Sequence, residues 1–368
     1  MISKTAKNAF FTLLRAGLWI DMEPELAVFP LPDEEWEAIY VLSVQQTVQA
    51  IVFDGLLKLP NQYLPPKGLL LRWTADTDRI ERRNRTMNQA VGELGELFAD
   101  HSLQALLLKG QGVAMCYENP SHRVCGDIDW CFASKGAYEK ANILIQSCGK
   151  KLYSPELSSN YVWNEIEVEH HYRMIDINNP FCYGYIQELI HGEQKYTSIK
   201  EILGKNVYLP SSLLAILIVN THILKHLLGL GVGMRQLCDS ARIYFEHNDS
   251  IDKAQLLQVY HRLGVHRWIQ LLHQVLDDFV GMPEDSLPFP LERSRKSDWM
   301  ISEIMYSGNF GYHDIRFGSS DASLRSGRGN IVWRYMRNLG NYFSLVPGEA
   351  FWLPLVKLGT RLNKWIYK

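Results

Sequence analysis

The stretch Arg123-Val-Cys-Gly-Asp-Ile-Asp-Trp-Cys-Phe132 decides the fold that this sequence predicts. Its second half is typical of the edge of a buried strand. Because strand side chains alternate between faces, Asp127 and Asp129 leave one face while Ile128 enters the core. Two neighbouring carboxylates repel each other unless a cation lies between them, and Mg²⁺ prefers such oxygen ligands. An isolated Asp-x-Asp would favour a solvated surface strand, so the neighbouring motifs decide between the two interpretations.

Upstream, an apolar run ends abruptly in a lysine and a glycine. The sequence from Gln104 to Gly110 predicts a buried strand and a tight turn, and a helix begins directly after it. Glycine lets a ligand approach the backbone closely, and the unpaired amides at a helix N-terminus attract anions. Lys109 adds a positive charge, so this turn is a candidate phosphate site.

Downstream, residues 166–174 alternate between apolar and polar side chains. Ile166 and Val168 share one face, whereas Glu169 and His171 share the other. Such alternation is typical of a half-buried strand. Its polar face, which also carries Glu167, can bring a third carboxylate beside the aspartate pair.

Together the three segments resemble the nucleotidyltransferase superfamily that includes DNA polymerase β. In that superfamily a Gly-Ser turn opens a helix, an acid-x-acid pair follows on the next strand, and a third acid comes from a neighbouring strand. The sequence is more similar to a poorly characterised bacterial branch, and the abortive-infection nucleotidyltransferase toxins share a related layout. Lys109 stands where the wider superfamily has serine. The matching residues are Lys109, Gly110, Ala114, Tyr117, Pro120, Arg123, Gly126, Asp127, Asp129, Val168, Glu169, His171, Lys225, His226, Arg235 and Asp239.

The resemblance implies a metal-dependent enzyme that moves a nucleoside monophosphate from a nucleoside triphosphate to an acceptor hydroxyl or amine and releases pyrophosphate. It implies that Asp127, Asp129 and Glu169 are catalytic and hold two Mg²⁺ ions, for which Mn²⁺ can substitute. The residues that it implies for binding the nucleotide are Lys109, Gly110, Arg123, Gly126, Lys225 and Arg235. Those that it implies for contacting the acceptor or orienting other groups are His171, His226 and Asp239.

These patterns predict an α+β fold with a small mixed β-sheet at its centre. We expect a helical region over residues 1–100, the nucleotidyltransferase core over 101–208 and a second helical region over 209–368. A chain of 368 residues is long enough for two or three packed units. Pro347 and Pro354 predict that the basic, aromatic C-terminal segment is not one long helix.

Composition narrows the class of protein. The formal net charge of −2 argues against a broad nucleic-acid-binding surface. The six cysteines lack paired metal-ligand spacing, which favours reduced thiols and a cytoplasmic protein. The apolar run from Leu213 to Val219 is too short to span a membrane. The sequence leaves the oligomeric state open.

Two helical pairs each have two interpretations. His222 and His226 share a helix face, so they either bind zinc or occupy a hydrogen-bonded core position, which we favour. Arg235 and Asp239 lie four residues apart, which predicts an intrahelical ion pair. The family resemblance instead places Lys225 and Arg235 near the triphosphate, and both interpretations can hold together.

Two other classes of protein compete with a transferase. One is a non-catalytic nucleotide-binding regulator or assembly partner that retains the fold. The other is a hydrolase or phosphotransferase that uses the same metal chemistry. The intact acid pair argues against the first, because a non-catalytic protein has no need of two repelling carboxylates. The acceptor (a small molecule, a tRNA end or a protein side chain) and the choice of nucleotide have no signal in the sequence.

Overall fold

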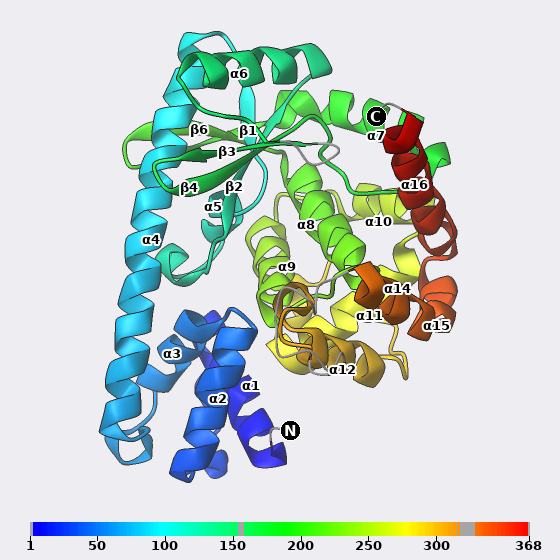
Figure 1. Cartoon of the computed structure of the whole chain (residues 1–368). Helices are drawn as coiled ribbons and strands as arrows, with labels where there is room; N and C mark the ends of the chain where they lie inside the picture. Colours follow the sequence, from blue (N-terminus) through cyan, green and yellow to red (C-terminus); the bar gives the residue numbers. More distant parts are fainter. Residues whose placement is uncertain (1–2, 154–157, 315, 317–327, 367–368) are drawn as a thin grey trace.

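The computed structural model describes residues 3–153, 158–314, 316 and 328–366 (Figure 1). It has the predicted α+β class, with a six-stranded mixed sheet between helical regions at the two ends of the chain. Among the described residues, no helix combines the length and the apolar character needed to cross a membrane.

The N-terminal region is helical, as predicted. Ser3 caps the first helix by accepting a hydrogen bond from the Ala6 amide. The chain turns at residues 46–48, so the apolar stretch from Trp36 to Leu57 forms two helices. The last helix is the longest and runs along one side of the molecule from the other N-terminal helices to the sheet (Figure 1). The four helices are α1 (Lys4–Leu18), α2 (Asp33–Gln45), α3 (Gln49–Leu57) and α4 (Lys67–Asp100).

The sheet has the strand order β3-β4-β2-β1-β6-β5. The β2–β4 and β1–β6 pairs are parallel, and the other three pairs are antiparallel. Short α5 (Gln111–Ala114) follows β1, and α6 (Lys135–Ser147) and α7 (Tyr183–Glu193) are the other helices of this region. The strands are β1 (Ala105–Leu107), β2 (Asp127–Phe132), β3 (Ser158–Trp163), β4 (Ile166–His171), β5 (Ser198–Ile202) and β6 (Lys205–Leu209).

The two faces of the sheet have different partners. Helices α4 and α6 cover one face, where Ile128 and Trp130 of β2 and Val168 of β4 are buried in one apolar cluster (Figure 1). Because side chains alternate along a strand, the acidic positions of β2 and β4 lie on the opposite face. That face is turned toward α5 and the C-terminal helices α8 and α9.

The C-terminal region is a set of helices that share a second apolar core with α1 and α3. Ser211 caps its first helix by accepting a hydrogen bond from the Leu214 amide. The helices are α8 (Ser212–Leu227), α9 (Met234–His247), α10 (Lys253–Arg262), α11 (His266–Val275), α12 (Ser297–Ser307), α14 (Arg328–Arg337), α15 (Leu339–Leu345) and α16 (Pro347–Ile366).

As predicted, the C-terminal segment is not one long helix, because it forms α14, α15 and α16. Pro354, however, does not interrupt α16. Pro347 is the first residue of α16, where a missing N–H costs nothing. Pro354 lies inside the helix and cannot bond to the carbonyl of Ala350. The hydroxyl of Tyr335 donates to that carbonyl instead, which satisfies the acceptor that the proline leaves free.

A close crossing of α1 and α3 depends on two glycines. A Cβ atom added at Gly55 would lie 1.9 Å from the Leu13 carbonyl oxygen, and one at Gly17 would lie 1.8 Å from that of Ile51. We expect Gly55→Ala to lower the free energy of unfolding by about 3 kcal/mol, because two backbones must separate. Gly68→Ala in α4 is the control, since a Cβ there meets nothing within 4 Å. Urea denaturation measures both, and equal stabilities would contradict this account.

His122 joins the loop before β2 to α3 and α4. Its Nδ1 lies 2.8 Å from the carboxylate of Asp54, and its Nε2 lies 2.8 Å from that of Glu81. Burial opposes protonation of His122, but the hydrogen bonds to the two acids outweigh burial and raise its pKa. Stability from this bridge is therefore present below the pKa of the unfolded chain, about 6.5, and is lost as pH rises through the higher folded-state pKa.

The pH dependence of unfolding tests this bridge. We expect the stability difference between wild type and His122→Gln to shrink as pH rises from about 6 to about 9. His191→Gln, which removes a histidine at an exposed position on α7, is the control. Chemical denaturation at a series of pH values provides the measurement, and a constant His122 difference would count against the bridge.

Candidate functional site

Strand pairing brings the polar faces of β2 and β4 together. In the parallel register Asp127 lies opposite Glu167, and Asp129 lies opposite Glu169. The strands keep this register because a slip by one residue would turn Ile128 and its apolar neighbours out of the core. The third carboxylate thus comes from a neighbouring strand, far along the chain from the Asp-x-Asp pair.

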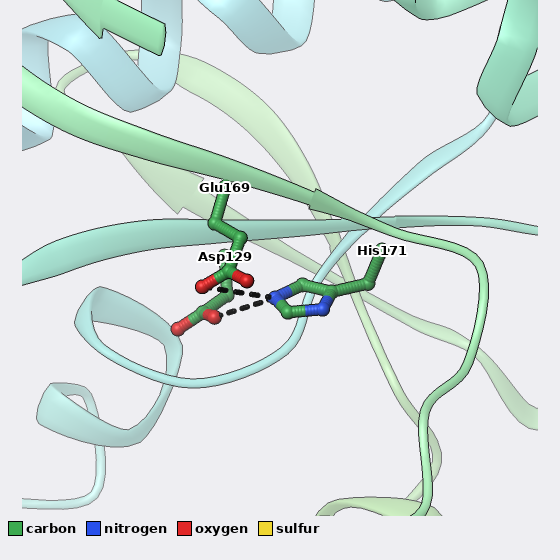
Figure 2. A group of neighbouring side chains, drawn as sticks. All are labelled: Asp129, Glu169 and His171. Carbon is green, nitrogen blue, oxygen red and sulfur yellow. Dashed lines mark hydrogen bonds and ion pairs between the residues drawn. The ribbon is translucent and has the colours of Figure 1, made fainter. Parts of the chain in front are cut away.

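Asp129, Glu169 and His171 form a compact group of potential metal ligands (Figure 2). His171 Nε2 lies 2.8 Å from Asp129 Oδ1 and 3.7 Å from Glu169 Oε2. One ligand atom from each residue lies within 4.8 Å of the others. Two carboxylates and an imidazole suit Mg²⁺, Mn²⁺ or a related divalent ion, so the residues present fit a metal centre.

Asp127 and Asp129 differ in their electrostatic surroundings. The charge of Asp129, reinforced by burial, raises the pKa of Asp127 to about 6. Burial also favours the neutral form of Asp129, but Lys109 and the hydrogen bond from His171 outweigh it and hold the pKa of Asp129 far below its usual range. Asp127 therefore takes up a proton before Asp129 as pH falls, and an added cation would stabilise both carboxylates.

The turn after β1 faces this acidic group. Gly110 has φ 57° and ψ −115°, and a Cβ there would lie 3.0 Å from the Asp127 carbonyl oxygen, so the tight turn requires glycine. The turn places Lys109 Nζ 3.1 Å from Asp129 Oδ1. Burial disfavours the charged lysine, but nearby carboxylates, Asp129 foremost, outweigh burial and raise its pKa.

Residues of α9 hold the loop that leads into β2. Arg123 Nε and Nη2 donate to the two carboxylate oxygens of Asp239 at 2.6 and 2.7 Å, and Tyr117 also donates to Asp239. Arg235 Nη1 donates to the Val124 carbonyl oxygen at 2.8 Å. Asp239 therefore pairs with Arg123 and not, as predicted, with Arg235, because Arg123 donates to both of its carboxylate oxygens.

An acid that the sequence analysis missed lies after β4 and contacts cavity-lining residues of α8. Asp176 accepts a hydrogen bond from His222 Nδ1 at 3.0 Å and forms an ion pair with Lys225 at 2.9 Å. His222 and His226 are hydrogen-bonded through their Nε2 atoms at 3.1 Å, as expected, but they line the cavity and do not lie in the core. Burial and then the charge of Lys109 lower the pKa of His222 to about 4, so this ring is neutral at neutral pH. A polar residue between Ile175 and Ile177 was the available signal for Asp176.

These elements enclose a cavity of about 360 Å³. The residues that the sequence analysis assigned to the site all line it: Lys109, Gly110, Arg123, Gly126, Asp127, Asp129, Glu169, His171, Lys225, His226, Arg235 and Asp239. His222, which was considered as a zinc ligand, lines it too. The cavity is also lined by polar and aromatic residues that the sequence analysis did not select: Thr47, Gln236, Asn309 and Phe310.

Comparisons with known proteins show the family of this chain. A family model described as an uncharacterised nucleotidyltransferase matches residues 32–281. A crystal structure of an antigenic nucleotidyltransferase-like protein from Paracoccidioides brasiliensis is similar over 53% of this chain and 92% of that chain, with 15% identity and a TM-score of 0.34. The comparison with curated proteins gave no match. Since the family model covers more than half of the sequence, this chain belongs to the uncharacterised nucleotidyltransferase family.

Proposed function

We propose that the protein is a metal-dependent nucleotidyltransferase. It would transfer a nucleoside monophosphate from a nucleoside triphosphate to an acceptor hydroxyl or amine, with release of pyrophosphate. The observation that carries this proposal is the convergence of Asp129, Glu169 and His171 in a cavity whose other walls carry Lys225 and Arg235. In-line phosphoryl transfer needs acidic residues that bind metal ions on one side of the site and basic residues that bind phosphate on the other.

In this proposal the acidic face of the sheet holds Mg²⁺. Asp129 and Glu169 supply oxygen ligands, His171 adds a nitrogen, and Asp127 completes the set from the same face of β2. When bound, divalent ions would stabilise the charge that develops on the attacking and leaving oxygens. Lys109, which neutralises Asp129 in this structure, is then free to contact a phosphate.

The positive side chains have two separate tasks. Lys225 and Arg235 line the cavity and, with Lys109 and the amides after Gly110, would bind the triphosphate, whose charge grows as pyrophosphate leaves. Arg123 has its donors occupied by Asp239 and Cys125, so we assign it to positioning the loop before Asp127. Gly126 belongs to this loop, and Arg83 holds its carbonyl oxygen at 2.9 Å.

Glu169 is the group best placed to take the acceptor's proton. Its carboxylate lies on the cavity wall beside Asp129 and His171. The acceptor oxygen or nitrogen forms a bond to the α-phosphorus as its proton passes to Glu169. The bond between the α-phosphorus and the bridging oxygen breaks, and its electron pair leaves with pyrophosphate.

Divalent-ion binding tests the acidic group. We expect Glu169→Gln to weaken Mn²⁺ binding by about tenfold or more, because it removes a charged ligand, whereas Glu167→Gln changes it by less than about twofold. The control lies two residues away on the same face of β4, but its carboxylate accepts a hydrogen bond from Tyr153 at the exposed edge of the site. Electron paramagnetic resonance of free Mn²⁺ measures both affinities. Equal effects of the two substitutions would remove Glu169 from the metal centre.

Isotope transfer tests the reaction. With Mg²⁺ and cell extract as the source of acceptor, label from the α-phosphate of a nucleoside triphosphate should appear on a larger product, and label from the γ-phosphate should not. We expect Asp129→Asn to reduce this transfer at least about 100-fold, while Glu167→Gln retains it. Transfer of γ-label or release of phosphate alone would indicate a phosphotransferase or hydrolase. Tight nucleotide binding with neither reaction would indicate the non-catalytic alternative.

A further inference from the structure

Two amide side chains that line the cavity, one buried and one half-buried, each have a buried polar atom without a partner among the described residues. They are Gln236 at the start of α9, with Nε2 unpaired, and Asn309 in the loop after α12, with Oδ1 unpaired. A buried polar atom left unsatisfied costs about 1–3 kcal/mol. Two such atoms in the same cavity, one a donor and one an acceptor, indicate a ligand that offers both kinds of group.

The orientation of the Gln236 amide is fixed by its surroundings. The side chain is only 4% exposed, and its Oε1 accepts a hydrogen bond from the Gly233 amide at 3.0 Å. Because a backbone N–H requires an acceptor, Oε1 of Gln236 must face Gly233, and Nε2 is the atom without a partner among the described residues. Arg235, the preceding residue, likewise has its Nε buried and unpaired among the described residues.

An aromatic ring lies next to these amides in an unusual backbone conformation. Phe310 has φ 52° and ψ 26°, a left-handed conformation that costs a non-glycine residue about 1–3 kcal/mol. Gly308 and Gly311, which also have positive φ, allow the chain to turn on either side of it. The ring lines the cavity, and its centroid lies 4.7 Å from that of the His226 ring.

We propose that this corner, made of Gln236, Asn309 and Phe310, binds the nucleobase of the nucleoside triphosphate. The base would lie against the Phe310 ring, donate an N–H to Asn309 Oδ1 and accept a hydrogen bond from Gln236 Nε2. A phosphate cannot satisfy Asn309, because it offers only acceptors at neutral pH. A sugar hydroxyl could bond to both amides but would gain nothing from stacking on the ring. Arg235 then lies between the base corner and the phosphates, which gives the nucleotide its direction in the cavity.

This inference rests on the proposed function, and binding without turnover separates the two. Isothermal titration calorimetry on the full chain with Mg²⁺ and no acceptor would use ATP, GTP, CTP, UTP and inorganic tripolyphosphate, which has the phosphates but no base. We expect Asn309→Ala and Phe310→Ala each to weaken binding of the nucleotide with the highest affinity about tenfold. Binding of tripolyphosphate should weaken less than about twofold. Retained tripolyphosphate binding also shows that each variant is folded.

Asn248→Ala is the matched control. Asn248 also has a buried Oδ1 without a partner among the described residues, but it lies at the other end of α9, outside the cavity lining. This substitution should leave the affinities for the nucleotide and for tripolyphosphate within about twofold of those of wild type. The inference is overturned if Asn309→Ala and Phe310→Ala leave nucleotide binding unchanged, or if they weaken tripolyphosphate binding as much as nucleotide binding. If Asn309 and Phe310 matter for nucleotide binding but no α-label is transferred, the base site stands and the transferase proposal fails.

Discussion

The buried negative charge of Asp129 is the constraint on which the site depends. This residue is only 3% exposed, so its charge must be balanced by groups that the fold supplies. The central position of β2 makes this possible, because β1 and β4 pair with its two edges. The turn after β1 provides Lys109, and β4 provides His171 and the second carboxylate. A divalent ion would neutralise the charge of Asp129 in place of Lys109. The same carboxylates can therefore pair with a lysine or bind a metal ion.

Local patterns made the centre of the sheet predictable. Alternation in β4 indicates which of its side chains are buried, the Asp-x-Asp spacing puts two carboxylates on one face of β2, and the lysine and glycine after β1 mark the turn. Each of these signals depends on neighbours in sequence. The β5–β6 hairpin has no such signal, since β5 is exposed at four of its five positions and shows no apolar alternation. The sequence also could not predict that Pro354 is tolerated inside α16, because this depends on a hydrogen bond from Tyr335 of another helix.

The candidate site shows the same division between local and long-range information. Its acids and basic residues could be selected because they occur in short, spaced motifs between residues 109 and 239. Thr47, Asn309 and Phe310 reach the cavity from segments far outside that span, and no spacing rule connects them to it. Asp176 lies close to β4 in sequence, but only the packing of α8 gives it His222 and Lys225 as partners.

The long helix α4 connects the N-terminal helices with the loop before β2. Its 34 residues extend about 51 Å at the usual helical rise. Arg83 and Asn84, near its middle, hold the carbonyl oxygens of Gly126, Ser121 and Arg123 in the loop that precedes the acid pair. Near its start, Trp73 is buried and donates to the Gln49 carbonyl oxygen of α3. The loop before the acid pair is therefore tied through α4 to the packing of the N-terminal helices, in addition to the direct contact of His122 with Asp54 of α3.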